Sequence, residues 1–203
     1  MSASDDQGEA WRRLAAAGHD LRQPMHALGL YLALLARKAE DPELGPRLTA
    51  ALDEARDALD LALDYAKLQA GGWTPRLREC RLAEIFADLG RRLGAQARLR
   101  GVELRFAGGR HCGLADGDLL LRALAALAGG AVRASRGGRV LVGVRLDGAG
   151  LRIEVHAGGQ ADCRADELAL ALAAGLAALA GGRLEAASDR AAVTIPRARP
   201  TLF

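Results

Sequence analysis

The chain has 203 residues and a formal net charge of +3, and its 50% hydrophobic content is enough to bury a core in one medium domain or two small ones. Aromatic residues make up only 3% and the arginines are scattered, which argues against a basic stripe or stacking platform for nucleic acid. No apolar run reaches the roughly 18 residues of a membrane span, and the start lacks the apolar core of a signal peptide. We therefore expect a cytoplasmic protein that binds neither nucleic acid nor membrane.

The segment AAAGHDLRQPMHALGLYLALL, residues 15 to 35, predicts a long amphipathic first helix. Its apolar and small residues follow one another in steps of three and four, which is the seam of a coiled coil or helical bundle; they are Trp11, Leu14, Gly18, Leu21, Met25, Leu28, Leu32 and Leu35. The turn DPELGP, residues 41 to 46, then leads into a second helix from about Arg47 to Ala70 that repeats the seam. Two helices cannot enclose a core alone, so we expect this hairpin to dimerise into a four-helix bundle.

After Pro75 the pattern predicts helices and short strands in turn. Three helices are expected: one whose apolar face covers 82–93, one over 116–135 and one over 166–182. The expected strands cover 102–107, 138–146, 150–157, 183–188 and 191–196. This order favours an α+β protein in which a two-layer α/β sandwich follows the hairpin. The predicted domains are residues 1–74 and 75–203.

The three cysteines are widely spaced, form no CxxC pair and leave one over. Neither a disulfide framework nor a zinc site is indicated, and we expect free thiols and no bound metal. The three are Cys80, Cys112 and Cys163.

One face of the first helix carries residues suited to phosphoryl chemistry. If the seam faces the bundle core, then His19, Gln23 and His26, spaced by four and three, line an outward face. An exposed imidazole that is largely neutral near pH 7 is a nucleophile able to take up a phosphoryl group. Beside it, Asp20 is placed to orient the ring or accept a proton, and Arg22 to donate to phosphate oxygens.

A proline interrupts this helix close to the candidate nucleophile. Pro24 has no N–H, so the carbonyl of Asp20 loses its helical partner. We expect a local bend beside His19, where a partner must reach the side chain.

The motif HDLRQP resembles the H-box of two-component sensor histidine kinases, and the helix that carries it resembles their dimerisation and phosphoacceptor helix. The second helix ends LDYAKLQAGG, which also resembles that family, and residues 76–198 resemble its ATP-binding lobe. The resemblance implies that His19 is phosphorylated, that Asp20 assists as a base and that Gln23 can position water for phosphatase activity.

The second lobe departs from the family where the nucleotide would bind. Residues 125–131, AALAGGA, stand in place of the asparagine-containing N-box. Residues 157–161, AGGQA, stand in place of the box whose aspartate binds adenine, and residues 167–171, ELALA, stand in place of a glycine-rich stretch. The resemblance thus implies a degenerate nucleotide site at Ala126, Gly130, Ala157, Gly159, Glu167 and Ala169. Because each lost polar contact costs about 1–3 kcal/mol, we expect no useful ATP binding.

These features predict a histidine phosphotransfer protein of a two-component phosphorelay. It would act as a homodimer and exchange phosphoryl groups with response-regulator receiver domains and with a hybrid histidine kinase. It would need no cofactor because the receiver supplies Mg²⁺. The alternative is a pseudo-histidine kinase that regulates a partner kinase or response regulator by binding or dephosphorylation.

Overall fold

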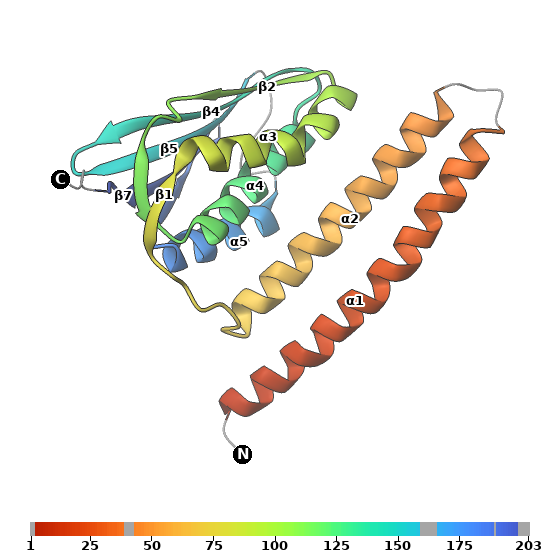
Figure 1. The fold of residues 1–203 in the computed structure, drawn as a ribbon, viewed down its shortest axis with the longest axis horizontal. Helices are drawn as coiled ribbons and strands as arrows, with labels where there is room; N and C mark the ends of the chain where they lie inside the picture. The colour runs from red at the N-terminus through yellow and green to blue at the C-terminus, as the bar shows by residue number, and fades with distance from the viewer. Residues whose placement is uncertain (1–2, 39–42, 159–165, 189, 199–203) are drawn as a thin grey trace. The chain divides into compact units, whose positions relative to one another are not determined.

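A computed structural model describes residues 3–38, 43–158, 166–188 and 190–198, and for residues 3–16, 19 and 20 it describes the helical backbone but not the side chains. The chain divides into two compact units, residues 1–73 and 74–203. The first unit is a helical hairpin and the second is an α/β lobe (Figure 1). No described helix is both long enough and apolar enough to cross a membrane.

The hairpin consists of helix α1, Ala3–Ala36, which continues through Pro24, and helix α2, Leu44–Gln69, which runs back beside it (Figure 1). Glycines let the two helices approach closely. A Cβ atom added to Gly18 would lie 2.5 Å from Cδ1 of Leu63, and one added to Gly29 would lie 2.8 Å from Cδ2 of Leu52. Both leucines are buried, so they fill the space that the glycines leave open.

The predicted seam of α1 divides into two halves in the single hairpin. Gly18 is buried, and Met25 and Leu32 are half-buried. The other half of the seam, which we call the leucine stripe, is exposed; its members are Leu21 (51%), Leu28 (48%) and Leu35 (59%). Trp11 and Leu14 of the predicted seam lie outside the described side chains. Among the seam residues from Gly18 to Leu35, one hairpin therefore covers only every second position.

The second helix begins earlier than its sequence pattern suggests. We predict a start near Arg47, whereas α2 begins at Leu44 and takes Gly45 and Pro46 into its first turn. Proline is tolerated there because the first N–H groups of a helix have no partner within the helix. The helix ends before Gly71, which has a left-handed φ of 64°.

The lobe is built around a mixed five-stranded sheet with the order β2-β4-β5-β7-β6. β2 pairs with β4 in parallel, and the other neighbours are antiparallel. The strands are β2 (Val102–Ala107), β4 (Gly138–Asp147), β5 (Gly150–Ala157), β6 (Arg183–Ala186) and β7 (Arg190–Pro196). The helices α3 (Leu82–Leu99), α4 (Gly117–Ala134) and α5 (Glu167–Leu179) lie on one side of this sheet (Figure 1).

The core lies between the helices and the sheet. In β5 the residues Leu151, Ile153 and Val155 are fully buried and alternate with polar residues. Leu120 and Leu124 of α4 are also fully buried. The predicted α+β class and its two-layer sandwich are confirmed.

A second, two-stranded sheet has no clear signal in the sequence. Strand β1, Arg78–Arg81, pairs antiparallel with β3, Cys112–Ala115. Each has four residues, and neither shows the alternation of apolar residues that predicts a half-buried strand. Cys80 and Cys112 are free thiols, and burial raises the pKa of Cys80; Cys163 lies outside the described residues.

The outward face of the large sheet carries a network of charged side chains. Arg152 donates from Nε to Oε1 of Glu154 at 2.9 Å and from Nη1 to Oε2 of Glu185 at 2.6 Å. The Arg152 and Glu154 side chains are only 12% and 14% exposed. Burial alone would raise the pKa of Glu154, but hydrogen bonds from Arg152 and His156 outweigh it and lower that pKa.

This lowered pKa predicts a pH dependence of stability. A carboxyl group whose pKa is lower in the folded state than its ordinary value of 4.5 stabilises the protein at pH values above 4.5. That contribution is lost as the pH falls through the pKa of the folded state. We expect the free energy of unfolding to fall between about pH 5 and pH 3, and to fall less steeply in Glu154→Gln. Urea denaturation at a series of pH values measures this; parallel curves for the two proteins would contradict the assignment.

Candidate functional site

The candidate phosphoacceptor lies in the N-terminal half of the hairpin. His19 and Asp20 both belong to the helical backbone of α1, and their side chains lie outside the described part of the chain. The residues that follow them, Arg22, Gln23 and Pro24, are all exposed. The helix therefore presents polar side chains within one turn of His19.

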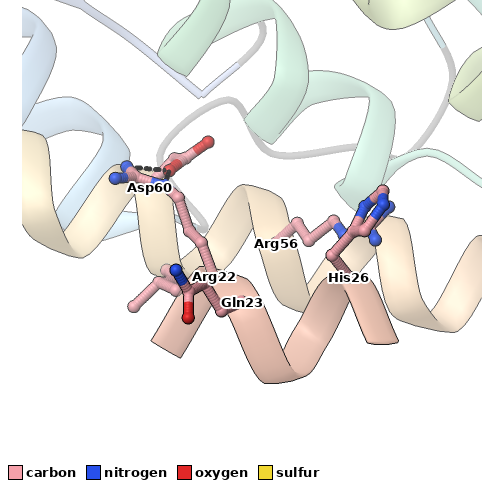
Figure 2. A pocket seen from close by; sticks show the side chains of 6 residues that line it. Arg22, Gln23, His26, Arg56 and Asp60 are labelled. Atoms are coloured by element: carbon pink, nitrogen blue, oxygen red, sulfur yellow. Dashed lines mark hydrogen bonds and ion pairs between the residues drawn. The ribbon is translucent and has the colours of Figure 1, made fainter. Parts of the chain in front are cut away.

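A pocket of about 540 Å³ lies between α1 and α2, just beyond His19 along the helix (Figure 2). Three of its lining residues come from α1 and three from α2; they are Arg22, Gln23, His26, Arg56, Leu59 and Asp60. Gln23 and His26 are exposed and have no hydrogen bond to a described residue. The pocket thus brings together three residues singled out in the sequence, Arg22, Gln23 and His26, and two charged residues of the other helix, Arg56 and Asp60.

Ion pairs hold the two arginines of this pocket. Arg22 donates to Oδ1 of Asp60 from Nε at 3.1 Å and from Nη2 at 2.5 Å, which links α1 to α2. Because both side chains are more than half exposed, this pair contributes at most about 1 kcal/mol to stability. Arg56 donates from Nη2 to the carbonyl oxygen of Met25 and from Nη1 to Oδ1 of Asp53, both at 3.3 Å.

Arg56 and Asp60 are site residues that the sequence pattern did not predict. They are spaced by four on α2, so they lie on one face of that helix. Their spacing was a usable signal, but it does not say which face of α1 they meet. That depends on the register between the helices, which the contacts of Gly18 and Gly29 with Leu63 and Leu52 define.

The positions predicted to form a degenerate nucleotide site fall on three elements of the lobe. Ala126 and Gly130 lie in α4 and are buried, and Ala157 ends β5. Glu167 and Ala169 lie in the first turn of α5, where Glu167 is exposed and Ala169 is 2% exposed. Gly159 lies outside the described residues.

An ion pair joins α4 to the start of α5 at this place. Arg133 Nη2 lies 2.5 Å from Oδ2 of Asp166, and the two side chains are 23% and 28% exposed. Oδ1 of Asp166 also accepts a hydrogen bond from the backbone N–H of Ala169 at 2.9 Å, which caps α5. A Cβ atom on Gly130 would lie 3.4 Å from Cβ of Asp166, so a larger side chain there would meet this aspartate.

Within the described ranges, no group of three or more histidine, cysteine, aspartate or glutamate side chains is arranged to hold a metal ion. No protein-family model matches the sequence, and no curated protein matches it.

Solved structures do match this arrangement of elements. Full-length ShkA, crystallised in complex with AMPPNP, superimposes with a TM-score of 0.62 at 21% identity, over 94% of this chain. The chain has a histidine kinase fold. It spans about half of the ShkA chain, 47% of its length.

Two further histidine kinases support the same fold. AdeS of Acinetobacter baumannii matches with a TM-score of 0.61 at 13% identity, over 89% of this chain and 98% of its own. The cytoplasmic segment of QseC matches with a TM-score of 0.54 at 18% identity, over 68% of this chain and 93% of its own. These matches confirm the resemblance to histidine kinases that the H-box and the lobe predict.

Proposed function

We propose that the protein is a histidine phosphotransfer intermediate of two-component signalling, which exchanges phosphoryl groups with receiver domains through His19 and does not use ATP. One observation carries this proposal: a histidine kinase fold keeps the H-box HDLRQP in α1 while its nucleotide-site positions hold residues without the usual polar contacts. A histidine with no way to be phosphorylated from ATP needs another phosphoryl donor.

The proposed reaction is an in-line displacement on an aspartyl-phosphate. A ring nitrogen of His19 attacks the phosphorus, the bond from phosphorus to the carboxylate oxygen breaks, and the receiver aspartate leaves as a carboxylate. The proton on the opposite ring nitrogen is held by a neighbouring acceptor, for which Asp20 is the candidate. The receiver brings the Mg²⁺ that neutralises the negative charge on the oxygens of the transferred phosphoryl group, so this chain needs no metal of its own.

The loss of nucleotide contacts is supported by what surrounds the altered positions. Ala157 has no carboxylate with which to bind adenine, and Gly130 has no amide for magnesium and phosphate. Asp166 lies against Gly130 and is held there by its ion pair with Arg133, so a side chain that already has partners occupies the space beside this altered position.

Phosphotransfer from labelled receiver domains tests the proposal. We expect label on the wild-type chain and none on His19→Ala. His111→Ala, which removes a histidine from the lobe, should be labelled like the wild type. Equal labelling of His19→Ala and the wild type, or no labelling of the wild type by any receiver of the source proteome, would refute the proposal. Calorimetric titration with ATP and Mg²⁺ should give no saturable heat; micromolar binding would instead restore a kinase.

The exposed leucine stripe favours one second candidate, a pseudo-histidine kinase that pairs its hairpin with an active kinase or sequesters a response regulator. In that case His19→Ala should behave like the wild type in cells, whereas a charged substitution at Leu28 should abolish the effect. Dephosphorylation of a receiver that depends on Gln23 but not on His19 would identify the phosphatase form of this candidate.

A further inference from the structure

We propose that the pocket between α1 and α2 binds the phosphoryl group of a small organic phosphate. The proposal concerns the binding of a ligand and not the transfer of a phosphoryl group to His19, although Arg22 and Gln23 belong to the helix face predicted to serve that transfer. Its evidence comes from the described side chains that line the pocket (Figure 2). Neither the phosphotransfer proposal nor the pseudokinase candidate requires it.

The donors that line the pocket outnumber its acceptors. Among the lining residues that the structure describes, two guanidinium groups, one amide and one imidazole face one carboxylate, that of Asp60. Arg22 uses Nε and Nη2 for Asp60, and its Nη1 has no bond to a described residue. Gln23 and His26 likewise have no partner among the described side chains. Because Arg22 is paired with Asp60 and Arg56 with Asp53, the described residues offer an anion unused N–H donors rather than a net positive charge from the arginines.

The second arginine is held in place before any ligand arrives. Arg56 is fixed at one end by Asp53 and at the other by the Met25 carbonyl, so its guanidinium lies across the groove toward α1. A guanidinium has five N–H donors in a planar fork, and two bonds leave the others available. A donor held in position loses less entropy on binding, which favours affinity.

A phosphoryl group suits this set better than a carboxylate does. It offers three strong acceptor oxygens in a tetrahedral arrangement, whereas a carboxylate offers two in a plane. The pocket's donors come from two helices and therefore approach from more than one direction. The volume of about 540 Å³ falls within the range of small-molecule sites, and Leu59 supplies an apolar wall for the organic part of the ligand.

Titration of the full, unphosphorylated chain tests this site. The imidazole resonances of His26 are followed by NMR while inorganic phosphate or glycerol 3-phosphate is added at constant ionic strength. We expect saturable shifts, and Arg56→Gln should weaken binding by about tenfold because a charge-assisted contact is lost. Tighter binding of the ester would identify the organic phosphate as the ligand; equal affinities would mean that the free ion is what the site takes and would overturn that part of the proposal.

The matched control is Arg37→Gln, which removes an exposed arginine from the turn that follows α1, outside the pocket. It should bind like the wild type. Gln23→Met changes an exposed side chain with no bond to a described residue, so it should weaken binding without disturbing the hairpin. Shifts that grow linearly with concentration, or an Arg56→Gln variant that folds and binds as the wild type does, would overturn the site. Since no receiver is present, this result is independent of phosphotransfer.

Discussion

Leu28→Glu is expected to convert a dimer of this protein into monomers. Leu28 is the middle residue of the leucine stripe and is 48% exposed in the single hairpin. Burying a leucine side chain is worth about 1.5–3 kcal/mol, and a twofold dimer carries each substitution twice. The dissociation constant should therefore rise at least roughly 100-fold.

Leu30→Glu is the matched control for this experiment. Leu30 is 58% exposed and lies two residues further along the same helix, roughly 160° around its axis from Leu28. We expect Leu30→Glu to remain dimeric in analytical ultracentrifugation at the concentration where Leu28→Glu is monomeric. A wild-type chain that sediments as a monomer, or equal effects of the two substitutions, would exclude a dimer through the leucine stripe.

Leu124→Ala is expected to lower the free energy of unfolding of the lobe by about 2–5 kcal/mol. The Leu124 side chain is fully buried in α4, so its truncation removes apolar contacts and leaves a cavity. Leu114→Ala makes the same chemical change in β3, where the side chain is 41% exposed, and should cost less than about 0.5 kcal/mol. Urea denaturation followed by circular dichroism compares the two; similar losses would mean that Leu124 is not part of the core.

The elements that were predictable from the sequence are those with a strong local period. The heptad of α1 and the alternation of β5 each repeat over several turns or residues, so both elements follow from them directly. The alternation also gives the buried face of β5, whereas the exposed leucine stripe of α1 is not covered within one hairpin. Strands β1 and β3 carry no such period because each pairs over only four residues. Their place depends on contacts between segments more than 30 residues apart, such as Arg78 with Ala115.

The site was predictable only where its residues share one helix. Gln23 and His26 follow from the spacing of α1, whereas Arg56 and Asp60 enter the pocket through the register between two helices. The Arg133–Asp166 pair likewise depends on how two helices pack together, because Arg133 lies in α4 and Asp166 lies at the start of α5. No periodicity within one segment contains that information.

The position of the leucine stripe on α1 has one further consequence. Leu28 and His26 differ by two residues, so they lie roughly 160° apart around the helix. Pairing of two copies through the stripe would leave both pockets and both H-box faces uncovered, which makes the assembly bivalent. A partner that is itself dimeric would then be retained by avidity, with an apparent affinity well above that of a single contact.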